Sequence, residues 1–269
     1  MNLTFYKPRN QILQQYIKGY YFITDDQTDQ TLNYRTFPNN YTILSISQNA
    51  NVVYSENKIA VVSSEEKKIS PNLVFRYTTP IEIYYEGPSS EITLYFKPLG
   101  LNHFFDGDLD FFVGGKNLEH FNPYPDFKEQ MEDIFNCETR EEQIDKLESY
   151  WLSKLLEKEF VLLREILTAV EQEIKINDIA KKHHFSRQYI NKLFTKNLGK
   201  SPTEYRKIHR FRNAMQTRNH SRNLSALSHE NLFYDQSHFI KDFKELSHLA
   251  PGAFFKTVNT DNENIWLFI

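Results

Sequence analysis

The chain has 269 residues, of which 40% are hydrophobic and 15% aromatic, and this composition excludes a disordered chain because it is ample for folded cores. Its single cysteine, Cys137, excludes an intramolecular disulfide, and no apolar run approaches the roughly 18 residues of a membrane span. The first ten residues lack the basic-then-apolar pattern of a secretory signal, so we expect a soluble, cytoplasmic protein.

The formal net charge of −3 conceals an asymmetry between two parts of the chain. Between Glu171 and Lys256 there are 16 Lys and Arg against 8 Asp and Glu, a net charge of +8. The rest of the chain has 16 Lys and Arg against 27 Asp and Glu, a net charge of −11. A basic excess is compatible with a solvated surface and with binding of nucleic acid. In the second case the acidic rest of the chain would repel phosphate and so discourage non-specific contacts with it.

Residues 1–125 have the pattern of a β-rich domain. A short helix is predicted around QILQQYIKGY, and the β-rich runs that follow are GYYFIT, YTILSIS, NVVYS, NLVFRYT, IEIYY and EITLYF. Strands this short, separated by turn signals such as FPNN and EGPSS, predict an antiparallel sandwich or barrel. Six aromatic residues of this region either line a pocket or belong to its core: Tyr34, Tyr41, Phe75, Tyr77, Tyr84 and Tyr95.

Residues 126–170 change to a helical period, through DFKEQMEDIF and REEQIDKLESYWLSKLLEKEF. The second of these segments carries an apolar stripe of Ile144, Leu147, Tyr150, Trp151, Leu155 and Leu156. A stripe at this spacing belongs to a core or to a dimer seam. We therefore expect a helical linker that supports a homodimer or packs on the β-rich domain.

Beyond residue 171 the sequence is helical and contains a weak internal repeat. An offset of 49 residues aligns Ser186 with Asp235, Phe194 with Phe243, and Pro202 with Pro251. Each copy has a short helix, a turn, a second helix capped by Ser or Asp, and a following helix opened by SP or AP. Two copies of one module are therefore predicted.

A short helix, a turn and a capped second helix with exposed polar residues is the helix-turn-helix plan. The second helix fits the major groove, where amides pair with adenine and cations pair with guanine or phosphate. The helix predicted at 202–217 is roughly 24 Å long, enough to hold two recognition helices about one DNA turn apart. The modules are expected to read successive major grooves.

Residues 174–256 resemble the DNA-binding region of the AraC/XylS family of bacterial transcription regulators. The resemblance is carried by INDIAKKHHFSRQYINKLFTKNLGKSPTEYRKIHRFRNAM and NLSALSHENLFYDQSHFIKDFKELSHLAPGAFF. More loosely, FPNNYTILSIS and ITLYFKPLGLNHFF resemble the β-rich sensory half of one branch of that family. The resemblance implies an α+β protein: a cupin-like β-rich sensory domain at 1–125, a helical linker at 126–170, a double helix-turn-helix domain at 171–258 and a tail at 259–269.

The implied function is a sequence-specific regulator, activator or repressor, that binds double-stranded DNA. A homodimer is expected, and a small-molecule effector and RNA polymerase are open as further partners. By position, the first recognition helix would present Arg187, Gln188, Asn191, Lys192 and Thr195 to DNA, and bury Ile190, Leu193 and Phe194. The second would present Gln236, Ser237, Ile240, Lys241 and Lys244, while Arg206 and Lys207 on the linking helix would face the DNA backbone.

Two positions depart from the family pattern. The turn before each recognition helix usually has glycine, and here His184 and Leu232 stand there. A residue with a β-carbon is strained in a left-handed conformation, so the sequence does not predict the geometry of these two turns. The caps, the prolines and the apolar spacing still predict the fold.

An enzyme and a protein-binding adaptor are the alternatives. A metal enzyme needs several convergent His and carboxylate ligands, but residues 1–120 contain only His103 and His120. His183 and His184 are adjacent and would face different ways on a helix. The sequence has no phosphate-binding glycine motif and no nucleophile elbow. We therefore expect no catalytic site, metal or cofactor, and strongly salt-dependent binding of duplex DNA would separate a regulator from an adaptor.

Overall fold

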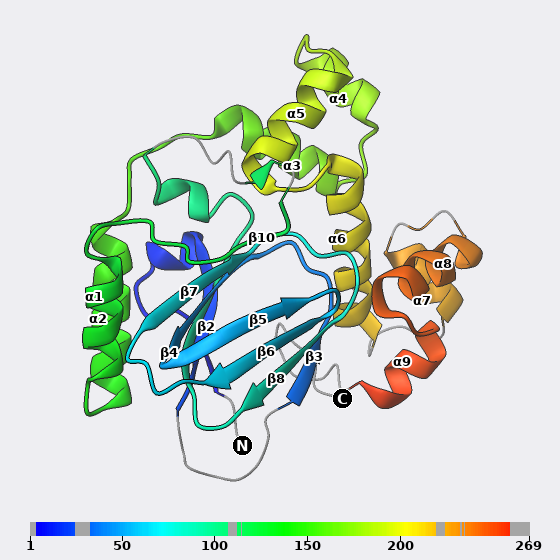
Figure 1. Ribbon diagram of the computed structural model, residues 1–269. Coiled ribbons are helices and arrows are strands. Elements are labelled where there is room, and N and C mark those ends of the chain that lie inside the picture. The colour runs from blue at the N-terminus through cyan, green and yellow to red at the C-terminus, as the bar shows by residue number, and fades with distance from the viewer. Residues whose placement is uncertain are drawn as a thin grey trace. The chain divides into compact units, whose positions relative to one another are not determined.

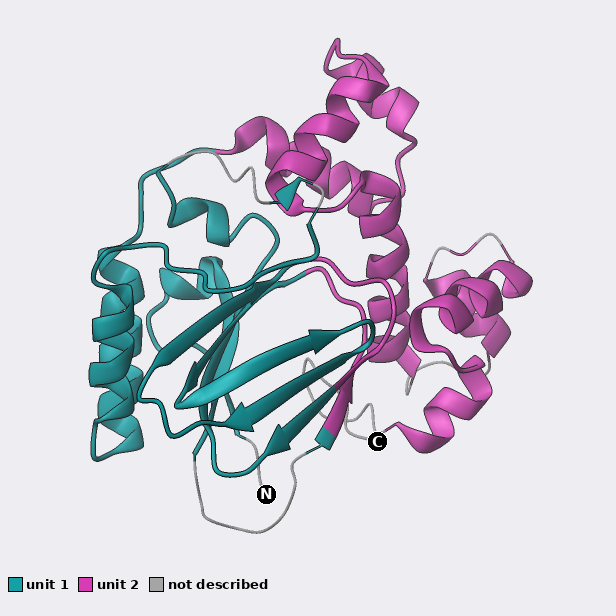
Figure 2. Cartoon of the chain, viewed as in Figure 1, with its two compact units in different colours: residues 1–33, 41–75, 83–159 teal, residues 34–40, 76–82, 160–269 magenta. Residues whose placement is uncertain are grey.

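The computed structural model describes residues 4–24, 33–106, 112–113, 115–218, 224–231, 233 and 235–258 (Figure 1). The chain divides into two compact units. The first comprises residues 1–33, 41–75 and 83–159, and the second comprises residues 34–40, 76–82 and 160–269 (Figure 2). None of the helices in the described ranges is long and apolar enough to span a bilayer.

The N-terminal half of the described chain is rich in short strands, as predicted. Its elements are β1 (Phe5–Tyr6), η1 (Leu13–Gln15), β2 (Ile17–Ile23), β3 (Asn33–Thr36), β4 (Thr42–Gln48), β5 (Ala50–Ser55), β6 (Lys58–Ser63), β7 (Ile69–Val74), β8 (Ile81–Glu86), β9 (Ser90–Phe96), η2 (Leu101–His103) and β10 (Asn117–Leu118). They form a six-stranded sheet in the order β1-β2-β9-β4-β7-β10 and a four-stranded sheet in the order β3-β8-β6-β5.

The register of the six-stranded sheet follows from alternation along its strands. In β4, Leu44 pairs with Leu73 of β7 on one side and with Leu94 of β9 on the other, and all three side chains are fully buried. Side chains one position along point to the other face, where the hydroxyls of Ser45 and Thr93 lie 2.9 Å apart. Because the side-chain period of a strand is two, a slip of one residue would exchange these faces.

Two helices pack on the core of the first unit: α1 (Phe127–Phe135) and α2 (Arg140–Ser153). α2 begins with a capping box in which Thr139 and Glu142 exchange side-chain to backbone hydrogen bonds of 3.2 Å. Its Trp151 is fully buried, with its ring 5.0 Å from that of Phe96. Four residues of the apolar stripe predicted as core or dimer seam, Ile144, Leu147, Tyr150 and Trp151, are therefore part of the core of this unit, and Leu155 and Leu156 are half-buried.

The second unit contains the helices of the C-terminal half: α3 (Val161–Glu171), α4 (Ile176–Lys182), α5 (Arg187–Leu198), α6 (Pro202–Thr217), α7 (Leu224–Glu230), α8 (Gln236–Ser247) and α9 (Pro251–Thr257). The predicted repeat is confirmed in the backbone. α5 and α8 begin and end 49 residues apart, and α6 and α9 both begin at proline. Even the left-handed residues that end the recognition helices correspond, Gly199 with φ 70° and His248 with φ 59°.

Segments 34–40 and 76–82 join the second unit through specific contacts. Phe37 is fully buried in the same core as Phe211 and Phe254. Arg76 forms a bidentate pair with Glu204 at the start of α6, with distances of 2.9 and 3.0 Å. This core therefore uses residues from outside the C-terminal half.

The predicted β-rich and all-α halves are confirmed, but several local predictions are wrong. The helix expected around residues 11–20 is one turn of 3-10 helix, because Ile17 already begins β2. The strand expected in NLVFRYT ends at Val74, since Arg76 and the residues after it join the second unit. The long helix expected to residue 160 ends at Ser153. Strands β1, β3, β6 and β10 were not predicted.

Of the six aromatic residues predicted to line a pocket or belong to the core, four are buried: Tyr34, Phe75, Tyr77 and Tyr95. Tyr41 and Tyr84 are half-buried. The predicted boundaries at residues 125, 170 and 258 stay predictions, and the tail at 259–269 lies outside the described residues.

Candidate DNA-binding surface

The first recognition helix, α5, separates an apolar face from a polar face. Ser186 caps it by accepting a hydrogen bond from the Tyr189 backbone N–H at 3.1 Å. Ile190 and Phe194 are fully buried on the apolar face, as predicted, whereas Leu193 is only half-buried.

The five residues predicted to contact DNA from α5 are exposed to different degrees. Arg187, Gln188 and Lys192 are exposed, and Asn191 and Thr195 are half-buried. The Asn191 side chain donates a hydrogen bond of 2.9 Å from Nδ2 to the Arg187 carbonyl, one turn back, which holds the amide at the helix surface. The second N–H of Nδ2 and the amide oxygen remain to be offered to a base.

The second recognition helix, α8, repeats this arrangement. Asp235 accepts from the His238 N–H at 2.7 Å, and Phe239 and Phe243 are fully buried. The residues predicted to contact DNA that are exposed on it are Gln236, Ser237, Lys241 and Lys244. Ile240, the remaining predicted residue, is half-buried against the core of the second unit, so its apolar side chain offers only part of its surface to a partner.

The turn before α5 requires the conformation that glycine usually supplies. His184 has a φ of 57°, in the left-handed region, and its N–H donates to Lys181 O at 3.2 Å. Histidine is among the residues that tolerate this region better than most, although at a cost. Leu232, at the corresponding turn of the second module, lies outside the described residues.

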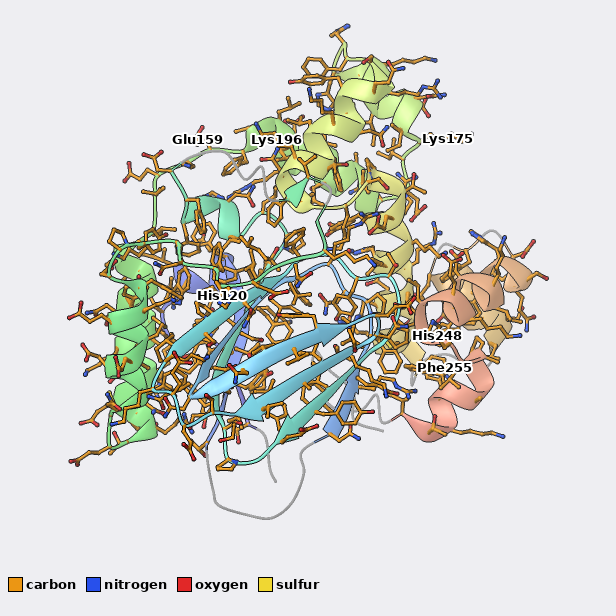
Figure 3. All side chains as sticks on the ribbon, in the orientation of Figure 1. His120, Glu159, Lys175, Lys196, His248 and Phe255 are labelled. Carbon is orange, nitrogen blue, oxygen red and sulfur yellow. The ribbon has the colours of Figure 1, made fainter. Side chains whose placement is uncertain are left out.

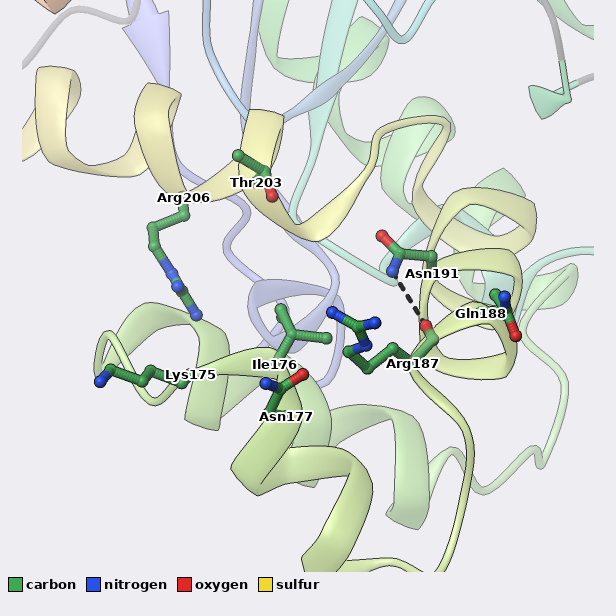
Figure 4. A pocket seen from close by; sticks show the side chains of 8 residues that line it. All are labelled: Lys175, Ile176, Asn177, Arg187, Gln188, Asn191, Thr203 and Arg206. Atoms are coloured by element: carbon green, nitrogen blue, oxygen red, sulfur yellow. Dashed lines mark hydrogen bonds between the residues drawn. The ribbon is translucent and has the colours of Figure 1, made fainter.

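A polar cleft of about 510 Å³ lies beside the exposed face of α5 (Figure 4). It is lined by residues of α5, of the start of α4 and of the first turns of α6: Lys175, Ile176, Asn177, Arg187, Gln188, Asn191, Thr203 and Arg206. Three of these residues are cations and none is an acid. Thr203, in the first turn of α6, contributes a polar side chain to the same cleft. The cleft is therefore suited to an anion.

Sequence reasoning did not predict Lys175, Asn177 or Thr203 as part of this surface. They stand at helix starts and have no periodic pattern of their own. Lys175 caps α4 through its backbone and is labelled in Figure 3, together with His248 at the end of α8. The one signal in the sequence was a lysine directly before a predicted helix. Its place in a cleft follows only from the packing of α4, α5 and α6 against one another.

Arg206 and Lys207, predicted to face the DNA backbone, both have partners inside the second unit. Arg206 donates from Nε to Val170 O at 3.1 Å and from Nη2 to Ile174 O at 2.6 Å, while still lining the cleft. Burial lowers the pKa of its guanidinium, and nearby Glu173 opposes this effect. Lys207 pairs with Glu245 of α8 at 2.5 Å. Contact with DNA would compete with these partners.

The residues weighed as metal ligands do not form a site in the described part of the chain. No group of three His, Cys, Asp or Glu side chains in the described ranges is placed to hold a metal ion. His103 is buried beside the Tyr16 ring, with centroids 4.4 Å apart, and His184 is exposed at its turn.

Comparison with protein-family models matches residues 179–257 to a helix-turn-helix domain. Among solved structures, one of ToxT from Vibrio cholerae is 14% identical, with 84% of this chain and 97% of that chain covered and a TM-score of 0.44. Another, of ToxT from Vibrio cholerae bound to an unsaturated fatty acid, is 15% identical, with 91% and 96% covered and a TM-score of 0.47. At these TM-scores the likenesses assign neither fold nor ligand to this chain. Comparison with curated proteins found no match.

Proposed function

We propose that this protein is a sequence-specific transcription regulator that reads duplex DNA with the AraC-type helix-turn-helix domain at residues 179–257. One observation carries the proposal. Two capped helices, α5 and α8, begin 49 residues apart, each burying one apolar face and exposing one polar face, and α6 joins them. A solvated surface alone gives no reason for this arrangement to occur twice.

The exposed groups supply both kinds of contact that DNA recognition needs. Gln188 and Asn191 on α5, and Gln236 on α8, have amides suited to the donor and acceptor pair of adenine. Arg187, Lys192, Lys241 and Lys244 are cations suited to guanine or to phosphate. Each helix would thus read one half of a bipartite site.

We assign the cleft beside α5 to a phosphate of the DNA backbone. Lys175 and Arg187 provide positive charge there, and Thr203, in the first turn of α6, provides a hydroxyl. A phosphate held there would fix the register of α5 in the groove without adding sequence information. Arg206 and Lys207 are proposed as further backbone contacts.

The test of this function is selection of bound duplexes from a random pool by the full chain, followed by titration at several salt concentrations. Selected duplexes should contain two half-sites centred about 10 base pairs apart, and affinity should fall steeply with salt. A chain that bound no duplex at low salt, or bound all sequences alike, would contradict the proposal and favour the adaptor.

A single-residue variant tests the cleft. Lys175→Gln should weaken binding to all duplexes alike and make the negative slope of log affinity against log salt shallower by about 0.9, the share of one phosphate contact. Lys146→Gln is the matched control, because Lys146 is exposed on α2 of the first unit. Equal slopes for both variants would remove the cleft from the DNA interface.

The remaining roles are proposed more broadly. The first unit would sense a small molecule or mediate a homodimer, and RNA polymerase would be the partner in activation. Most of the stripe that motivated the dimer is buried in the core of the first unit, so the homodimer needs a test of its own. Light scattering at tens of micromolar protein, with and without DNA, provides it. A regulator that binds chromosomal DNA works where that DNA lies, which in the bacterial family it resembles is the cytoplasm.

A further inference from the structure

Arg210, in the middle of α6, hydrogen-bonds both to the turn that precedes the first helix-turn-helix module and to the recognition helix of the second. Its Nη1 donates to Glu173 Oε2 at 3.0 Å, and its Nη2 donates to Asp242 Oδ2 at 3.1 Å. Glu173 stands in the turn between α3 and α4, beside the first module. Asp242 stands on α8, the second recognition helix. One side chain therefore joins the supports of the two reading helices.

The link is largely removed from water. The side chains of Arg210, Glu173 and Asp242 are 12%, 21% and 8% exposed. The Arg210 guanidinium also lies over the ring of Phe233, 5.1 Å from its centre, in the turn that leads into α8. A guanidinium is planar and offers its N–H groups in a fixed fork, so two carboxylates bound to it are held at a set separation.

Other basic side chains also contact each carboxylate. Arg206 lies 3.4 Å from Glu173, while Lys207 and His238 lie 3.6 and 3.3 Å from Asp242. Arg206 and Lys207, both on α6, each bind one of the two carboxylates, whereas the contact of His238 lies within α8. The contacts of Arg210 span both, so they bear on the relation between the modules.

We infer that Arg210 sets the relative position of α5 and α8, and hence the spacing between half-sites that the protein accepts; this inference rests on the proposed function. Each base pair inserted between two half-sites moves the second one along the axis and rotates it by about a tenth of a turn. A pair of recognition helices held rigidly cannot follow this displacement. A pair released from the shared guanidinium would adapt to several spacings.

The test compares affinities for a duplex selected by the full-length protein and for the same duplex with one or two base pairs inserted between its halves. The wild-type protein should strongly prefer the selected spacing. Arg210→Met keeps most of the apolar stem but loses both hydrogen bonds. The ratio of its affinities for the selected and the altered spacing should be smaller than that of the wild type by about fivefold or more, as when coupling between two sites is lost. Arg210→Lys keeps the charge but not the fork of N–H groups. Its affinity ratio should lie between those of the wild type and Arg210→Met.

A purely structural role predicts a different result, namely an equal loss of affinity at every spacing and for a single half-site. Asn213→Ala is the control, since Asn213 is on the same helix but its side chain lies 3.0 Å from His209, one turn back on α6, and the spacing preference of this variant should equal that of the wild type. An unchanged preference in folded Arg210→Met would overturn the inference.

Loss of Arg210 leaves two buried carboxylates without their shared partner, which is a reason for the single variant to unfold. The triple variant Arg210→Met, Glu173→Gln, Asp242→Asn removes these charges, and the same relaxed spacing is expected of it. Wild-type spacing preference in the folded triple variant would also overturn the inference. Failure of the wild-type protein to bind any duplex would instead reject the proposed function.

Discussion

The ring of Phe37 packs edge to face on the ring of Phe254, with their centres 4.9 Å apart, and both side chains are fully buried. Phe37 comes from a segment near the N-terminus, and Phe254 from α9 of the second module. Arg212 of α6 holds this segment by donating to the carbonyls of Phe37 and Pro38. The core under the second recognition helix is thus completed from the other end of the chain.

Replacing Phe37 should therefore destabilise the second unit. Phe37→Ala leaves a cavity beside Phe254, and we expect a loss of about 3–5 kcal/mol in the free energy of unfolding. Urea unfolding followed by circular dichroism measures it. Phe185→Ala is the control, because Phe185 is 38% exposed and should cost far less. Equal losses from the two variants would show that the contact contributes nothing particular.

The isolated fragment from about residue 160 onward should still fold and bind DNA, since it holds both recognition helices and α6. Because it lacks Phe37, it should unfold at lower urea concentration than the same helices in the full chain. Electrophoretic mobility shift of the fragment tests binding. A helical fragment that gave no shift at low salt would contradict its independence.

The two recognition helices should read separate base positions. Asn191→Ala should relax preference in one half-site and Gln236→Ala in the other, each by about 1–3 kcal/mol of discrimination. Binding profiles on a library of point-mutated sites would reveal this. If both variants lost base preference at the same positions, or at none, the model of two separate reading helices would be wrong.

The turn before α5 should gain stability from glycine. His184 has a φ of 57°, and a side chain in this region costs roughly 1–2 kcal/mol, part of which glycine loses again through its greater freedom in the unfolded chain. We expect His184→Gly to stabilise the second unit by up to about 1 kcal/mol. Lys182→Gly, within α4, should instead destabilise it by about 1 kcal/mol. Loss of stability in both variants would indicate that the His184 side chain makes a contact worth more than its strain.

Lys200 should make stability depend on pH above neutrality. It is 2% exposed, and burial lowers its pKa from 10.5 to about 8, against the attraction of Glu204. The unfolded chain therefore binds this proton more tightly than the folded chain, so stability should rise with pH between about 8 and 10.5, by about 3 kcal/mol at most.

Lys200→Met isolates this effect. The variant should be more stable than the wild type near pH 7 and should approach it near pH 10.5, because only the wild type carries the buried charge. Urea midpoints across this range measure the difference. A difference that did not change with pH would show that Lys200 keeps its proton in the folded protein.

The sequence by itself determined the local elements of the DNA-binding half. Caps at Ser186 and Asp235, prolines at 202 and 251, and phenylalanines on one face of each recognition helix are encoded within a few residues of each other. Short-range signals of this kind need no knowledge of distant neighbours, and for this reason the repeat was predicted with the right residues, whereas Asn191, Thr195 and Ile240, expected on the exposed faces, are half-buried.

Only the tertiary structure decided which distant groups meet. The cleft beside α5 forms where three helices converge, the Arg210 link joins residues up to 37 positions away, and Phe37 enters a core some 200 residues along the chain. Periodicity along one helix carries no information about these contacts, because each depends on how chain segments pack. The stripe on α2 shows the same limit: its spacing fits a dimer seam and a core equally, and the burial of Trp151 against Phe96 decided for the core.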